Sequence, residues 1–535
     1  MDNQIKDKKN TLSNQKRIAV ILAALAVVLA VVYVIILLLK KDYSVVLPLY
    51  DADGDVLDYT YTCESGNPVA EVSRDESNLT LEADSEISYT ARPFIYPELN
   101  LEKLDSIHVV NDSGEFTVYL DKTSGEYLFK GNEMILYNEQ PLAELKFQSR
   151  YMLAIKKVDG SYTDNAALAD FGLDEESNPV SVTVTDTDGN SYTVLFGDKL
   201  VTGAAYYAKA ADKPYVYVVD STVSVFFNEE NSYFNPMITT PLSQSEYNYI
   251  DSFSISKNGE MFMSSEIVPE EQRQGTGDTD LHKLNYPAKY PASLTKYYEA
   301  LACFANLSGS SVVETNVLST SEENANELFE KYGLTVASND VKYSYNGTEY
   351  RFITGNKYTD EDGTTGYYAY SPYMDTIVKL PLENAPFLEY ELIDFIDQSV
   401  FQMNIDNVSE ITAHVPGVTC HFVLEGAGKD LKVTETNTGN VIDTDSFRQF
   451  FISLLTVKIE GYATKDDVTG PNEFGFTVVS RFDETSEFEF DIISTTRALI
   501  TLDGNSEFYT NRSYVTTAAE RLLMLVNGEK IEADY

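Results

Sequence analysis

The sequence contains no tryptophan and few cysteines and histidines, two side chains that often bind metals or act in catalysis. Its 535 residues include three cysteines and four histidines. Cys63, Cys303 and Cys420 lie in three separate regions, so they do not form the paired framework of a disulfide-rich protein, and we expect small buried side chains. The 38 tyrosines and 27 phenylalanines must therefore supply the aromatic part of the core.

Basic residues are also scarce. The chain has 39 lysines and arginines against 84 aspartates and glutamates, a formal net charge of −45 at pH 7. A surface of this sign is repelled by phosphate groups, which excludes nucleic acid as a partner and argues against a body that lies flat on anionic lipid. The balance suits exported, soluble domains that are held away from a surface.

Sequence motifs of catalysis are missing as well. The chain has no Walker loop, no Gly-x-Ser-x-Gly elbow and no His-Glu-x-x-His pattern. His414 and His421 are expected on one face of a hairpin, but no third ligand follows at a metal-site spacing. Asp-rich stretches such as residues 51–55 fail the EF-hand pattern and are typical of hairpin turns, although calcium binding by an acidic cluster stays open. We therefore assign no catalytic, cofactor-binding or metal-ligating residue, and expect no cofactor and no enzyme.

The chain has one long hydrophobic run. Residues 18–39 are 22 residues without a charge, a glycine or a proline, and as a helix they would span about 33 Å, enough to cross a bilayer. Residues 1–17 carry five basic groups against two acidic ones, which predicts a cytoplasmic N-terminus. A cleaved signal peptide is less favoured, because its hydrophobic region is usually about 7–15 residues long. We expect a signal anchor with everything after it outside the cell.

Beyond a β-rich segment, residues 42–100, the chain repeats one pattern three times. Leu104, Ile250 and Ile405 each open an alternating strand, a glycine-containing turn and a second strand, which indicates a hairpin. A helix is expected after each hairpin, and in the third unit Asp443 or Asp445 would cap it. That helix has the clearest apolar stripe, formed by Phe447, Phe450, Phe451, Leu454 and Leu455.

An aromatic–glycine–apolar pattern follows each predicted helix. It occurs as Phe171-Gly172-Leu173, Tyr332-Gly333-Leu334 and Phe474-Gly475-Phe476. We expect Gly172, Gly333 and Gly475 to occupy equivalent turns, where glycine allows positive φ or close approach. Further hairpins after each glycine predict an α+β fold with helices packed on antiparallel sheet. The predicted parts are a cytoplasmic tail 1–17, a transmembrane helix 18–39, the β-rich segment 42–100, and α+β repeats 101–240, 247–398 and 402–535.

Several segments of the first repeat together resemble a known family. These segments are Asp170-Phe171-Gly172-Leu173-Asp174, Val180-Ser181-Val182-Thr183-Val184, Phe196-Gly197-Asp198, Tyr206-Tyr207-Ala208 and Val216-Tyr217-Val218-Val219. They resemble a bacterial domain of unknown function that is anchored by one N-terminal helix and is often encoded beside ABC transporters similar to those of gliding motility. The resemblance covers roughly residues 104–240 and extends more loosely over the later two repeats. It carries over no catalytic residue.

Two classes of function follow. The first is a single-pass protein of the bacterial cell membrane with extracellular domains, a non-catalytic accessory or binding component of an ABC-type transport system. The membrane would be contacted through residues 18–39, and an ABC permease and its ATPase would be the protein partners, with no small-molecule ligand identified. The second is a cell-envelope hydrolase acting through paired carboxylates, which the many acidic residues leave open. A surface adhesin is a third alternative.

Overall fold

The computed structural model describes residues 29–30, 33, 43–50, 56–63, 70–74, 89–92, 95–96, 99, 104–158, 160–273 and 281–533. The predicted cytoplasmic tail and nearly all of the predicted transmembrane segment lie outside the described residues. Within the described part of the chain, no helix is long and apolar enough to cross a membrane. The membrane anchor and its orientation therefore stay predictions.

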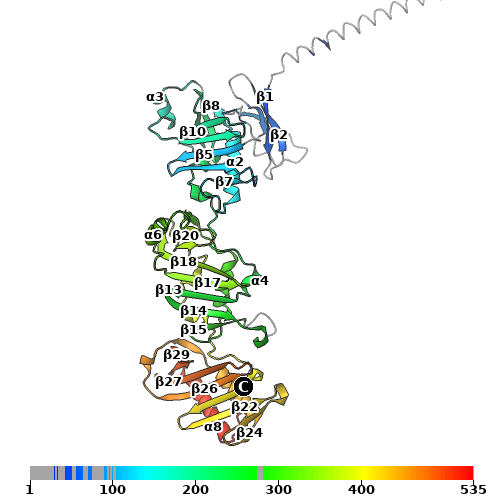
Figure 1. Cartoon of the computed structure of the whole chain (residues 1–535), viewed down its shortest axis with the longest axis vertical. Helices are drawn as coiled ribbons and strands as arrows, with labels where there is room; N and C mark the ends of the chain where they lie inside the picture. Colours follow the sequence, from blue (N-terminus) through cyan, green and yellow to red (C-terminus); the bar gives the residue numbers. More distant parts are fainter. Residues whose placement is uncertain are drawn as a thin grey trace, which may run out of the picture. The chain divides into compact units, whose positions relative to one another are not determined.

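The chain divides into two compact units. Figure 1 labels their helices and strands. The first comprises residues 1–133 and 137–233, and the second comprises residues 134–136 and 234–535. The predicted boundaries of the repeats are not tested by this division. The first unit includes a four-stranded antiparallel sheet in sequential order, formed by β1 (Tyr43–Tyr50), β2 (Val56–Cys63), β3 (Ala70–Arg74) and β4 (Tyr89–Arg92).

A larger, eight-stranded sheet completes the first unit. Its order is β7-β6-β5-β9-β10-β11-β12-β8, and every neighbouring pair is antiparallel. Its strands are β5 (Leu104–Asn111), β6 (Gly114–Leu120), β7 (Tyr127–Phe129), β8 (Lys156–Lys157), β9 (Val180–Asp186), β10 (Ser191–Lys199), β11 (Ala205–Ala210) and β12 (Val216–Asp220). Its helical segments are α2 (Glu139–Tyr151), α3 (Asn165–Leu168), η3 (Ala169–Phe171), η4 (Ser221–Phe227) and η5 (Glu230–Tyr233).

The second unit opens with another eight-stranded antiparallel sheet, in the order β15-β14-β13-β17-β18-β19-β20-β16. Its strands are β13 (Ser252–Lys257), β14 (Glu260–Ile267), β15 (His282–Tyr286), β16 (Ser311–Glu314), β17 (Asn339–Tyr345), β18 (Thr348–Thr359), β19 (Thr365–Ser371) and β20 (Thr376–Pro381). Its helical segments are α4 (Gln244–Tyr247), η6 (Glu270–Gln272), α5 (Lys296–Ala302), η7 (Cys303–Ala305), α6 (Glu322–Lys331), η8 (Pro386–Glu389) and η9 (Leu392–Phe395).

A nine-stranded antiparallel sheet follows in the same unit, in the order β24-β23-β22-β21-β26-β27-β28-β29-β25. Its strands are β21 (Val408–Val415), β22 (Val418–Glu425), β23 (Lys432–Glu435), β24 (Asn440–Ile442), β25 (Ile459–Tyr462), β26 (Asn472–Ser480), β27 (Thr485–Ile492), β28 (Arg497–Leu502) and β29 (Asn505–Asn511). Its helical segments are η10 (Ile405–Asn407), η11 (Gly428–Asp430), α7 (Thr444–Leu455), η12 (Lys465–Asp467) and α8 (Arg512–Val526).

The three large sheets share one plan, which confirms the predicted α+β class. Each opens with a strand meander, continues through a helix to the strand that forms the far edge, and closes with a four-stranded meander. The third sheet differs in three places. Its opening meander has four strands instead of three, and only the single turn η12 lies between its far-edge strand β25 and its closing meander. It also ends in the long helix α8.

One face of each large sheet carries the main core. In the third sheet, Phe422 of β22 lies against Phe447 and Phe450 of α7, with ring centroids 5.2 and 6.3 Å apart. Helix α8 packs on α7 and on strands β21, β26, β28 and β29. The predicted stripe of phenylalanines on α7 is therefore core, and Asp443, one of the two predicted caps, accepts the amide N–H of Ser446 at the start of the helix.

Gly172 and Gly333 lie where a helical segment ends and turns toward the closing meander. Their φ angles are 65° and 71°, in the left-handed region that favours glycine. A Cβ at Gly172 would collide with Asp198 of β10, and one at Gly333 would collide with Asn356 of β18. Tyr332, just before Gly333, then packs on Tyr368 with ring centroids 4.8 Å apart. These glycines let a second small core form on the opposite face of the sheet.

Gly475, predicted at an equivalent turn, instead lies inside strand β26. Because successive side chains alternate in a strand, Phe474 and Phe476 both point into the main core, where Phe476 stacks on Phe488 at 4.5 Å. The third sheet has no helix at this place for a glycine to end. The shared three-residue pattern therefore marks two different structures.

Candidate functional site

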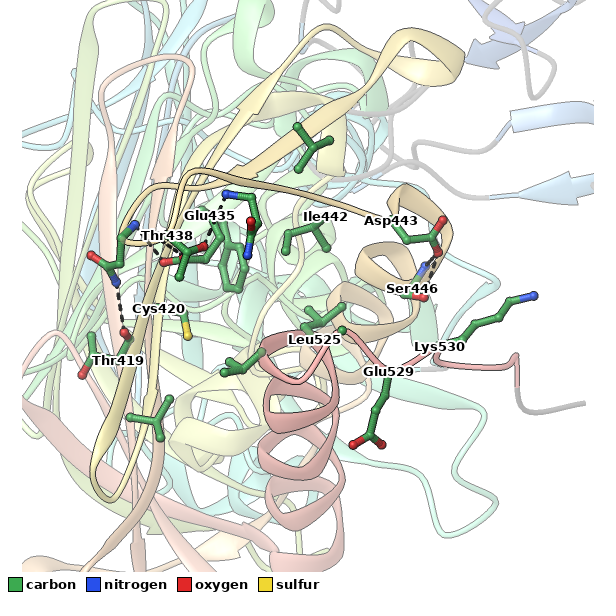
Figure 2. A pocket seen from close by; sticks show the side chains of 17 residues that line it. Thr419, Cys420, Glu435, Thr438, Ile442, Asp443, Ser446, Leu525, Glu529 and Lys530 are labelled. Atoms are coloured by element: carbon green, nitrogen blue, oxygen red, sulfur yellow. Dashed lines mark hydrogen bonds between the residues drawn. The ribbon is translucent and has the colours of Figure 1, made fainter.

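One candidate site is a cavity of about 760 Å³ at the edge of the third sheet. We call it the β24 groove, because it is lined by strands β22, β23 and β24, the start of α7 and the end of α8 with the residues that follow it. Figure 2 shows Ile442 and Leu525 between the turn at Glu435 and Thr438 and the helix start at Asp443 and Ser446. Its volume is in the range of ordinary ligand sites.

The turn between β23 and β24 is held by Glu435. One carboxylate oxygen accepts the amide N–H of Asn437 at 3.0 Å, and the other accepts the amide N–H and hydroxyl of Thr438 at 2.8 and 2.5 Å. Burial would raise the pKa of Glu435, but these hydrogen bonds outweigh it and lower the pKa. Glu435 is thus a charged, buried acceptor whose lone pairs are used by its own turn.

Asp443, another of the three acids that line the groove, is used by helix α7. Its carboxylate accepts the amide N–H and the hydroxyl of Ser446 at 2.9 and 2.8 Å. The backbone amide of Ser446 is the main cause of the lowered pKa of Asp443. The hydroxyl oxygen of Ser446 in turn accepts the amide N–H of Ile531 at 3.2 Å, which ties the residues after α8 to the start of α7. These polar groups build the groove and are not free to act in chemistry.

The apolar part of the groove runs from its interior to its rim. Cys420, Phe422 and Leu525 are buried. Val441 of β24 and Val526 of α8 remain 64% and 46% exposed. Burial, with a smaller contribution from Glu435, raises the pKa of the Cys420 thiol, so the thiol is a poor nucleophile at neutral pH. The site can therefore hold an apolar group.

Each of the two histidines of the third hairpin contacts a carboxylate of its own. As predicted, Thr412 pairs with His421 and His414 with Thr419, so both imidazoles share the outer face of the β21–β22 hairpin. Each has its own carboxylate: His421 Nε2 lies 3.0 Å from Glu410, and His414 Nε2 lies 3.2 Å from Glu489. Among the described residues, no group of three or more potential ligands could hold a metal ion.

Gly475 belongs to this face. In strand β26 it pairs with His414 of β21 on one side and with Glu489 of β27 on the other. A Cβ at Gly475 would meet both the Glu489 carboxylate and the His414 ring. Glycine is required here because two side chains contact each other across its strand, a reason that no local pattern in the sequence reveals.

The two cysteines whose side chains are described are free. Cys420 is buried, as expected, whereas Cys303 is only half-buried at the end of α5.

The sequence analysis gave Cys420 no role in a site. Leu525 and Val526 of α8, which line the same groove, are about 100 residues further along the chain. Asp443, three residues before Ser446, could be predicted as a helix cap from the local sequence, but nothing local predicted the groove.

Two segments of the chain match one protein-family model, residues 140–327 and 315–476. The matches together cover more than half of the chain, from helix α2 to strand β26. The chain therefore belongs to this family, which is described as a domain of unknown function (DUF4340). Comparisons with curated proteins and with solved structures found no match.

Proposed function

We propose that the chain is a membrane-anchored, extracytoplasmic protein that acts as a non-catalytic accessory or binding component of an ABC-type transport system. Its β24 groove would receive an apolar segment of the permease. The observation that carries this proposal is that Glu435 and Asp443 are engaged in the turn and the helix cap, while Val441 and Val526 leave an apolar rim exposed. Exposed apolar surface beside a pocket is typical of a binding site.

The membrane and the transporter enter this proposal from the sequence. Residues 18–39 are long enough to cross a bilayer, and the basic residues before them favour an external location for the rest of the chain. The family that the first repeat resembles is often encoded beside ABC transporters. One spanning helix is too little for a transport path, and the chain has no nucleotide-binding loop. A shared membrane would raise the effective concentration of the two partners.

The test is affinity capture of the full-length tagged protein after gentle detergent extraction. We expect a permease and its ATPase to be recovered with it. Replacing Val441 by Asp should reduce this recovery at least several-fold, because a charge at the rim opposes apolar contact. Val336→Asp is the matched control. Val336 lies between α6 and β17, is 66% exposed and does not line the groove. Equal recovery with both variants would contradict docking at the groove.

One observation favours the alternative of a hydrolase. Burial raises the pKa of Glu489, the charge of Glu487 adds to this, and the His414 imidazole opposes it. An acid with a raised pKa beside other carboxylates is a pattern that glycosidases use. If the purified chain released reducing ends from cell-wall polysaccharide and Glu489→Gln abolished this activity, the hydrolase would replace the accessory role.

A further inference from the structure

A second cavity, of about 200 Å³, lies within the second compact unit. We call it the junction cavity, because residues of the second sheet, of the third sheet and of the segment that joins them all line it. The second sheet contributes His282 and Lys283 of β15, and the third contributes Phe488 of β27. It shares no lining residue with the β24 groove.

The charge of the junction cavity is opposite to that of the chain. Arg273, Lys283 and Lys289 line it, and Glu484 is its single acidic lining residue. The whole chain carries a formal charge of −45, so a concentration of cations in one cavity is a departure from its general surface. Cations gathered in a hollow attract an anion more strongly than the same cations on an open surface.

Two of these cations are held in place. Lys283 Nζ lies 2.9 Å from Glu484 and 3.5 Å from Glu266, so its charge is compensated. The Arg273 Nε–H donates to the carbonyl oxygen of Val268 at 2.9 Å, which orients the guanidinium. Lys289 is exposed at the mouth of the cavity. Arg273 and Lys289 are therefore the groups that can meet an incoming anion.

Aromatic side chains also line the junction cavity. Phe401 and Phe488 meet edge to face, with ring centroids 5.5 Å apart, and both are buried. Phe482 also lines the cavity and is 36% exposed. Such rings offer apolar surface and favourable edges to a flat or branched apolar group.

His282 adds a neutral polar wall. The buried ring donates from Nε2 to the carbonyl oxygen of Ile250 at 2.9 Å, which leaves Nδ1 to accept the hydroxyl of Tyr298 at 3.2 Å. Burial lowers the pKa of His282 to about 4, so the ring stays uncharged at neutral pH. It completes the cavity without adding a fourth cation.

We propose that the junction cavity binds a small organic carboxylate with an aromatic or branched apolar body. The carboxylate is bound by Lys289 and Arg273, and the body packs on Phe482, Phe401 and Phe488. This inference is independent of the docking groove. Because both sheets contribute to the walls, the bound molecule also holds the second and third sheets together.

The absence of tryptophan from the chain makes a clean test available. In full-length protein carrying Phe482→Trp, tryptophan fluorescence that is excited without exciting the tyrosines reports on this cavity alone. Titration with benzoate should give a saturable change, and benzamide, which has the same shape without the charge, should bind at least five-fold more weakly. Calorimetric titration of the unsubstituted chain with benzoate must also give saturable binding, which guards against an effect of the reporter.

The charge is tested with Lys289→Glu, which should weaken benzoate binding at least ten-fold. Lys342→Glu is the matched control, because Lys342 is an exposed lysine of β17 outside the cavity, and its affinity should equal that of the parent. Unchanged melting temperatures for both variants establish that they are folded. No saturable binding by calorimetry, or equal binding of benzoate and benzamide, would overturn the proposal, as would equal affinities for the two lysine variants.

Discussion

Gly333 in the second sheet and Gly475 in the third stand in the same aromatic–glycine–apolar pattern, yet they solve different problems. Gly333 ends helix α6 with φ 71°, and its missing Cβ makes room for Asn356. Gly475 lies in an extended strand, and its missing Cβ makes room for His414 to reach Glu489. The difference arises because the third sheet lacks the helix that precedes the closing meander in the second.

The largest effect in this comparison is expected at Gly333. Gly333→Ala imposes both positive φ and a collision with Asn356, so the unfolding free energy should fall by about 3 kcal/mol. Gly347→Ala is the matched control, because its φ is 76° but nothing lies within 4 Å of the added Cβ. We expect about 1 kcal/mol there. Chemical denaturation measures both, and equal losses would show that the collision is unimportant.

A smaller effect is expected at Gly475. Gly475→Ala meets no backbone strain, only the ends of two flexible side chains, so a loss of about 1 kcal/mol is expected. The loss should disappear when His414 and Glu489 are both replaced by Ala, because the colliding atoms are then gone. The double-mutant comparison measures this coupling. A loss that persists in that background would mean that Gly475 is needed for another reason.

The pKa values of Glu435 and Glu489, both in the third sheet, are shifted in opposite directions, so we expect opposite effects of pH on stability. The pKa of Glu435 is lowered, so its stabilisation is present above the ordinary value of 4.5 and is lost as the pH falls through the lowered pKa. Glu435→Gln should therefore lower the unfolding free energy at pH 7, by an amount on the order of 1 kcal/mol for weakened charged hydrogen bonds, and the deficit should shrink in acid.

The pKa of Glu489 is raised, first by burial, so the sign is reversed. The folded chain holds this proton more tightly, and its stabilisation is present below the ordinary value of 4.5 and is lost as the pH rises through the raised pKa. Glu489→Gln should be more stable than the parent at pH 7 and equal to it in acid. Urea denaturation from pH 3 to pH 8 tests both variants. If the unfolding free energies of the two variants, relative to the parent, changed with pH in the same direction, the opposite pKa shifts would be contradicted.

Much of the fold was predictable because it rests on short-range periodicity. The alternation in Leu104–Asn111 and its two counterparts defined the opening hairpins, and the register placed Thr412 opposite His421. The phenylalanine stripe defined the buried side of α7, and the sequence offered Asp443 or Asp445 as its cap, of which Asp443 is the one observed. Each of these statements depends on residues within a few turns or one hairpin of each other, where sequence spacing and spatial neighbourhood coincide.

The sites could not be predicted in the same way. Leu525 of α8 and Cys420 of β22 line the β24 groove together, and Lys289 and Phe482 line the junction cavity together, although both pairs are far apart in the sequence. Gly475 has the same local sequence pattern as Gly333 but lies in a strand. What its Cβ would meet is decided by β21 and β27, which pair with that strand on either side. The sequence by itself determined the hydrophobic run, the charge, the repeated α+β pattern and the local caps, since these follow from neighbouring residues. Only the tertiary structure decided which distant side chains share a cavity, since long-range packing brings them together.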